Sequence, residues 1–115
     1  MTSLVGVVET SPYLAEAKRL MSEEERATVV ETVAANPEGG VVVRGTGGLR
    51  KLRIPLRGRG KRSGGRVIYW YHSKDSPAVL LAVFAKNEAS DLPAARWKLL
   101  ERIAAGLIED FRCAK

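Results

Sequence analysis

Two segments rich in β-branched and aromatic residues, 66–72 (RVIYWYH) and 78–86 (AVLLAVFAK), are separated by the five residues SKDSP. Val, Ile, Tyr, Trp and Phe favour strands, whereas Ser, Asp and Pro favour turns. Two strands joined by so short a connection pair in the antiparallel direction. The sequence therefore predicts a β-hairpin here, and the rest of the chain has to fold around it.

Helical patterns flank the predicted hairpin on both sides. Apolar residues recur at helical spacing over residues 13–21 and 22–35, and Ser22 followed by Glu25 is a capping-box pattern that predicts a break between two helices. Residues 93–111 predict one long amphipathic helix that packs across the sheet. Its apolar residues at fourfold spacing are Leu99, Ile103, Leu107 and Phe111, with Leu100 beside them.

Shorter β-like segments complete the pattern. Residues 4–10 predict a first strand, residues 49–56 predict an edge-type strand interrupted at Pro55, and residues 41–43 suit a further short strand. The order β-α-α-β-β-β-α predicts an α+β fold, with a small antiparallel-dominated sheet, two N-terminal helices and a C-terminal helix. We expect the helices mainly on one face of the sheet, and a single domain over residues 1–115.

The strongest charge feature lies in the middle of the chain. Residues 44–66 hold nine Lys or Arg, seven Gly and no acidic residue, although the whole chain has nineteen basic and thirteen acidic residues and a net charge of +6. The positive charge is therefore a patch, and such a patch collects phosphate groups and releases counterions when it binds them. We expect this segment to bind RNA; a solvated basic loop without a specific ligand is the alternative.

Several classes of protein are disfavoured by composition. The lone Cys113 excludes an internal disulfide, and the lone His72 excludes a histidine-rich metal site. No apolar run approaches the roughly 18–20 residues that span a bilayer, and the first ten residues lack an export-signal pattern. We therefore expect a cytoplasmic protein that uses neither a metal nor another cofactor and does not enter a membrane.

Three stretches, GTGGLRKLR (45–53), GKRSGGRVIYWYH (60–72) and VFAKNEASDL (83–92), resemble the RelE/HigB toxin superfamily and come nearest to its HigB-like branch. The resemblance covers most of the chain. Members are toxins of type II toxin–antitoxin systems that cleave mRNA in the ribosomal A site, and they use a small β-sheet flanked by helices. The resemblance thus implies a ribosome-dependent mRNA endoribonuclease with a cognate antitoxin protein as its partner.

Metal-independent RNA cleavage requires a base for the attacking 2′-hydroxyl, an acid for the leaving 5′-oxygen, and cations around the phosphorus. By resemblance, Arg66 at the start of its strand holds the scissile phosphate, and Lys86 is the basic residue that closes the last strand. His72 is the third predicted catalytic residue. The predicted RNA-binding residues are Arg50, Lys51, Arg53, Arg57, Lys61, Arg62 and Tyr69, the last of which either stacks on bases or fills the core.

The sequence departs from the family at one position of the site. The better-known branch carries a tyrosine shortly after its last strand, where this chain has Asp91, Leu92 and Pro93. The proton acceptor is therefore open between His72, Glu88 and a lysine. A non-catalytic RNA- or ribosome-binding module is the second interpretation. A DNA-binding repressor is a third, for which the helical stretches show no helix-turn-helix pattern.

Overall fold

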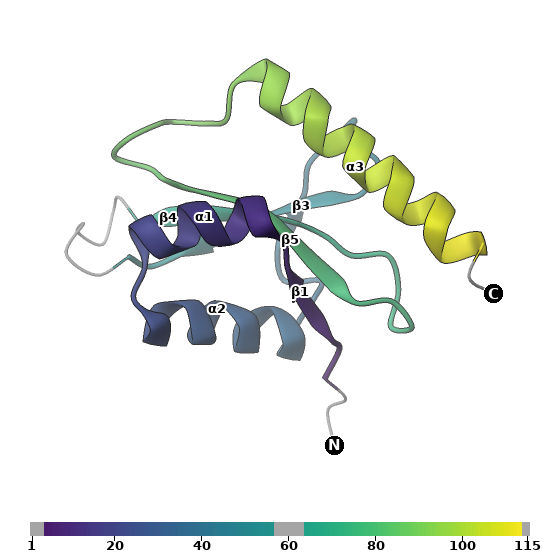
Figure 1. Ribbon diagram of the computed structural model, residues 1–115, viewed down its shortest axis with the longest axis horizontal. Coiled ribbons are helices and arrows are strands. Elements are labelled where there is room, and N and C mark those ends of the chain that lie inside the picture. The colour runs from purple at the N-terminus through teal and green to yellow at the C-terminus, as the bar shows by residue number, and fades with distance from the viewer. Residues whose placement is uncertain (1–3, 57–63, 114–115) are drawn as a thin grey trace.

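The computed structural model describes residues 4–56 and 64–113, and it has an α+β fold (Figure 1). The predicted order of elements is confirmed, with one further two-residue strand before the basic segment. The elements are β1 (Val7–Glu9), α1 (Ser11–Leu20), α2 (Glu23–Ala35), β2 (Val41–Val42), β3 (Leu49–Ile54), β4 (Gly65–Trp70), β5 (Ala78–Ala85) and α3 (Ala94–Cys113).

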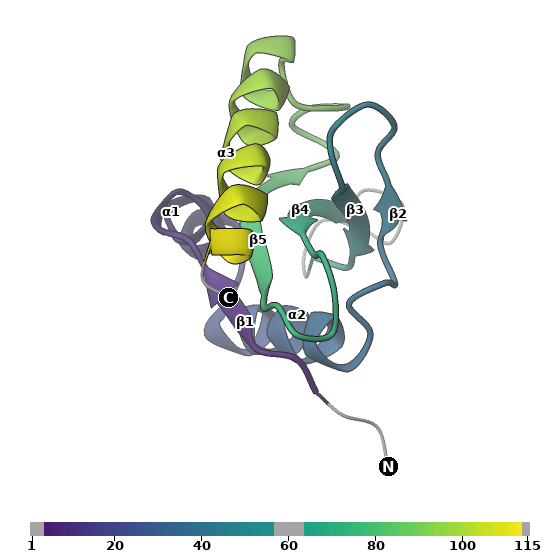
Figure 2. The ribbon, with the colours of Figure 1, turned by 90° about the vertical axis from the view of Figure 1, so that its right-hand side faces the viewer.

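The five strands form one mixed sheet in the order β1-β5-β4-β3-β2. The predicted hairpin is confirmed, because β4 and β5 pair antiparallel with Val67 opposite Val83. Strand β1 pairs with β5 in the parallel direction, and β3 pairs antiparallel with both β4 and β2. Figure 2 shows β5, β4, β3 and β2 side by side in that order, with α3 next to β5.

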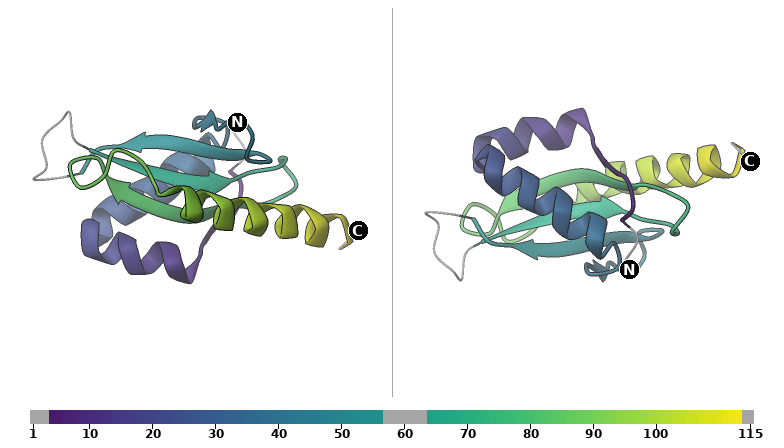
Figure 3. Two further views of the ribbon diagram at one scale, coloured as in Figure 1. Left: turned by 90° about the horizontal axis from the view of Figure 1, so that it is seen from above. Right: turned by 90° about the horizontal axis from the view of Figure 1, so that it is seen from below.

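Helices cover both faces of the sheet, whereas the sequence led us to expect them mainly on one face. Helices α1 and α2 pack on one face, where Tyr13 and Val33 meet Val67 and Leu80. Helix α3 packs on the opposite face, as the two views of Figure 3 show. The physical reason lies in β5, whose eight residues are all buried. A strand that is apolar on both sides has to be covered on both sides.

The local signals at the start of α2 act as the sequence predicts. Ser22 Oγ accepts a hydrogen bond from Glu25 N at 3.1 Å, and Glu25 Oε1 accepts one from Ser22 N at 2.9 Å. This reciprocal pair satisfies two backbone N–H groups that have no partner within the helix. The break between the two N-terminal helices is therefore encoded by two residues three positions apart.

The buried side of α3 agrees with the prediction only in part, because Leu100 and Leu107 pack on the core but the rest of the predicted stripe that the structure describes does not. Leu99 and Ile103 are 48% and 36% exposed, whereas Leu100 and Ala104 are almost fully buried against β4 and β5. Apolar residues occupy two adjacent stripes of this helix, so helical periodicity permits either stripe to face the sheet. The tertiary packing selects the stripe that contains the smaller Ala104.

The assignment of α3 can be tested with two adjacent leucines. Leu100→Ala removes a fully buried side chain and leaves a cavity, so we expect it to lower the free energy of unfolding by about 2–5 kcal/mol. Leu99→Ala truncates a half-exposed side chain and should cost no more than about 0.5 kcal/mol. Urea denaturation of both variants measures the difference, and equal losses would contradict the helix orientation.

Candidate nucleic-acid interface

Three cationic side chains share the face of the sheet that α3 partly covers. Strand register places Lys51 opposite Ile68 and Arg53 opposite Arg66, which in turn is opposite Phe84. Ile68 and Phe84 belong to the core beneath α3. Because cross-strand partners point to the same side of a sheet, Lys51, Arg53 and Arg66 point to the α3 side as well.

Lys86 extends this group at the end of β5. It lies two residues beyond Phe84, and its backbone N–H donates to Gly64 O at 3.0 Å, which continues the ladder between β4 and β5 past the last strand residue. The Lys86 ammonium donates to Ser90 O at 2.8 Å, so the loop that leads to α3 holds the side chain. The cationic face is defined here as Lys51, Arg53, Arg66 and Lys86.

Within the cationic face, Arg53 and Arg66 lie directly opposite each other on β3 and β4. Like charges directly opposite each other on neighbouring strands destabilise a sheet. Arg66 Nη1 donates to Gly65 O at 3.0 Å, and Arg53 is exposed. Across residues 4–56 and 64–113, neither guanidinium forms an ion pair with a carboxylate. A bound phosphate would relieve the repulsion, and planar guanidinium groups suit its oxygens.

Asp91 and Trp97 contact the cationic face through Lys51. The Lys51 ammonium is 3.5 Å from Asp91 Oδ1 and 5.5 Å from the centre of the Trp97 ring. Trp97 Nε1 donates to the same oxygen at 3.2 Å. Partial desolvation opposes ionisation of Asp91, but the N–H of Leu92, the charge of Lys51 and the indole N–H outweigh it and lower the pKa of the carboxyl group. Sequence reasoning assigned neither residue to the site.

Two predicted RNA-binding residues, Arg50 and Tyr69, lie on the opposite face of the sheet. Tyr69 is fully buried; its hydroxyl donates to Pro37 O at 2.7 Å and accepts from Gly40 N at 2.9 Å. Burial raises the pKa of this phenol. The guanidinium of Arg50 donates to Glu38 O and to Gly40 O. The stacking role of Tyr69 was therefore wrong, because the ring is part of the core.

His72 and Glu88 do not join the cationic face. His72 follows the far end of β4 and stacks on Trp70, with ring centres 6.0 Å apart. It is six positions along a nearly extended chain, roughly 20 Å, from Arg66 near the start of the strand. Glu88 pairs with Arg19 of α1 at 3.0 Å. The prediction that His72 acts together with Arg66 and Lys86 therefore conflicts with the topology.

Three further predicted RNA-binding residues, Arg57, Lys61 and Arg62, lie outside the residues that the structure describes. Among the described residues, no group of three or more His, Cys, Asp or Glu side chains is arranged to hold a metal ion. None of the helices in those same parts of the chain is long and apolar enough to cross a bilayer.

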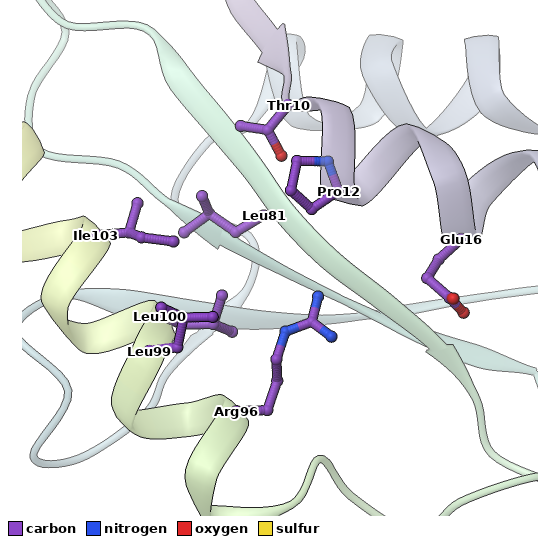
Figure 4. Close-up of a pocket in the computed structure, with 8 residues that line it drawn as sticks. All are labelled: Thr10, Pro12, Glu16, Leu81, Arg96, Leu99, Leu100 and Ile103. Carbon is purple, nitrogen blue, oxygen red and sulfur yellow. The ribbon is translucent and has the colours of Figure 1, made fainter.

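A separate hollow of about 460 Å³ lies between α1 and α3 (Figure 4). Its lining is mainly apolar, with Leu81 of β5 and Leu99 and Ile103 of α3, and Glu16 and Arg96 are its charged residues. The residues that line it include none of the four cations of the cationic face. The hollow is thus distinct from the cationic face, and its apolar lining does not suit a polyanion.

Comparison with known proteins supports the fold. No protein-family model matches the chain. Among solved structures, the chain is similar to E. coli toxin RelE, determined in the free state as a double arginine-to-alanine mutant, with a TM-score of 0.54 and 21% sequence identity. The match covers 76% of this chain and 87% of that chain. The chain therefore has a RelE-like α+β fold.

The structural role of Tyr69 gives a testable result. Tyr69→Phe leaves Gly40 N–H and Pro37 C=O without their partner, so we expect a loss of about 1–3 kcal/mol in the free energy of unfolding. Tyr71→Phe, one residue after the end of β4, is the matched control, with an expected change within about 0.5 kcal/mol. Thermal and urea unfolding provide the measurement. A Tyr69→Phe protein as stable as the wild type would contradict this structural role of the hydroxyl group.

Proposed function

We propose that this protein is the toxin of a type II toxin–antitoxin system, and that it inhibits translation by cutting mRNA on the ribosome. The observation that carries the proposal is the cationic face, whose facing Arg53 and Arg66 have no carboxylate partner among the described residues. The RelE-like fold supports it, because the neighbour of known structure is a toxin. The resemblance to the HigB-like branch, read from the sequence, points in the same direction.

The proposed reaction is an attack of the RNA 2′-oxygen on the adjacent phosphorus. The new 2′-O–P bond forms as the P–O5′ bond breaks, which leaves a 2′,3′-cyclic phosphate on one product and a 5′-hydroxyl on the other. Arg53 and Arg66 stabilise the negative charge that grows on the phosphoryl oxygens. The proton leaves the 2′-hydroxyl and another reaches the 5′-oxygen. Lys86 is the residue of the cationic face that we propose for these transfers, and the Lys51 ammonium adds positive charge beside the phosphate.

The proposed partners follow from the same surface. Ribosome-bound mRNA in the A site supplies a phosphodiester that is already oriented, which lowers the entropic barrier to attack. The cognate antitoxin neutralises the toxin with an acidic or extended segment that covers the cationic face or blocks entry to the ribosome. Both interactions place the protein in the cytoplasm, and charge-driven RNA binding makes its affinity fall as salt rises.

A non-catalytic RNA- or ribosome-binding module is the second candidate. The observation that favours it is the position of His72, which lies at the other end of β4 from Arg66. The same four cations would then bind phosphate without cleaving it. Cleavage products distinguish the two functions, because both predict binding and only the first predicts cut mRNA.

The proposal is tested by induced expression in a bacterial host, with primer extension on a translated reporter mRNA. We expect growth arrest and codon-phased cuts from the wild type. Arg66→Ala removes a cation that faces the scissile phosphate, so we expect cleavage to fall about 10²-fold or more. Lys86→Ala should reduce it similarly. In vitro cleavage on purified ribosomes gives the rates.

Lys74→Ala is the matched control, because Lys74 is an exposed lysine in the turn between β4 and β5, at the other end of the sheet. It should cleave like the wild type. Circular dichroism and ribosome co-sedimentation establish that each variant folds and binds. Intact mRNA from a folded, ribosome-bound wild type would reject the endonuclease and favour the binding module.

A further inference from the structure

A three-residue contact joins Lys51 of the cationic face to Asp91 and Trp97, which have no role in the function proposed so far. Asp91 Oδ1 accepts from Leu92 N at 2.8 Å and from Trp97 Nε1 at 3.2 Å, and it lies 3.5 Å from the Lys51 ammonium. The same ammonium sits 5.5 Å from the centre of the Trp97 ring. The contact joins three elements: β3, the loop after β5, and the first turns of α3.

We propose that Asp91, held in place by Trp97, is a positioning residue that fixes the Lys51 ammonium on the cationic face, facing the phosphodiester of single-stranded RNA. This inference rests on the proposed function, and it adds two residues that the sequence did not assign to the site. Asp91 acts through Lys51 and does not itself contact the reacting atoms.

The need for such a device follows from the nature of lysine. Its ammonium is a point charge on a flexible four-carbon stem, and fixing that stem costs rotamer entropy. An ion pair and an aromatic face restrain the ammonium from two sides. The restraint is formed before RNA binds, so ordering of Lys51 does not oppose binding or catalysis.

The geometry favours positioning over proton transfer by Asp91. Three donors converge on one oxygen, and they hold the carboxyl group ionised, which weakens it as a base. Trp97 in turn belongs to the helix that covers the sheet, where its ring packs against the core of Leu100 and Ile68. The position of the carboxylate therefore depends on the packing of α3, and that of the ammonium depends on the carboxylate.

The decisive experiment is a double-mutant cycle of Asp91→Asn and Lys51→Ala on ribosome-dependent cleavage. Asparagine keeps an oxygen acceptor for Leu92 and Trp97 and removes the charge that holds Lys51. We expect Asp91→Asn to lower kcat about 10-fold with KM nearly unchanged. In the Lys51→Ala background, the same substitution should have no further effect, because Asp91 acts only through Lys51. Equal losses in both backgrounds would overturn the proposal.

Asp75→Asn is the matched control for charge. It makes the same change at an exposed aspartate in the turn between β4 and β5, and we expect kcat and KM to stay at the wild-type values. Trp97→Phe keeps an aromatic ring and removes the indole donor, so we expect a smaller, severalfold loss of kcat. If Asp75→Asn lowers kcat as much as Asp91→Asn does, the change in net charge alone accounts for the loss, and the positioning role is rejected.

Two readouts separate failure of this inference from failure of the proposed function. If the wild type leaves mRNA uncut, the same double-mutant cycle is measured as affinity for a fluorescein-labelled single-stranded RNA decamer. Each affinity of an Asp91→Asn variant is then compared with that of the Asp75→Asn variant, which has the same net charge change. Non-additive affinities would uphold the positioning of Lys51, and additive ones would reject it. In NMR spectra, the Trp97 indole N–H resonance should titrate at acidic pH in the wild type and not in Asp91→Asn. Identical titrations would show that the contact is absent in solution.

Discussion

The hairpin of β4 and β5 is the constraint on which the rest of the structure depends. All eight residues of β5 are buried, and β4 places Val67 and Tyr69 in one core and Ile68 and Trp70 in the other. A sheet with two apolar faces is stable only when helices cover both, since each uncovered side chain leaves apolar surface in water. Helices α1 and α2 fill one side and α3 fills the other. What stays open is the end of β3 and β4 that carries the arginines.

The cationic face illustrates how a stable ladder can hold groups that repel one another. Arg53 and Arg66 are partners in the register of β3 and β4, and the backbone hydrogen bonds of that pairing keep them together. Apolar side chains at these two positions would remove the repulsion, so the facing charges do not add to the stability of the sheet. Local rules of sequence and structure are broken most often where a protein binds or catalyses. A phosphate bound between the two guanidinium groups would relieve their repulsion more than water does.

The contact of Lys51, Asp91 and Trp97 connects the cationic face to the packing of α3. Trp97 donates to the carboxylate from a helix that is held on the sheet by Leu100 and Ala104. Helix α3 therefore contributes both to this contact and to the hydrophobic core.

The sequence by itself determined the hairpin, the capping box of α2, the order of elements and the location of the positive charge. These features depend on neighbouring residues, whose spacing sets strand alternation, helix capping and turns. Only the tertiary structure decided that helices cover both faces, that Leu100 and not Leu99 faces the sheet, and that Tyr69 is core. It also brought together Lys51 and Asp91, which are forty residues apart, and kept His72 away from Arg66. Such choices depend on which long-range packing buries the most apolar surface without leaving polar groups unpaired, and no local pattern contains that comparison.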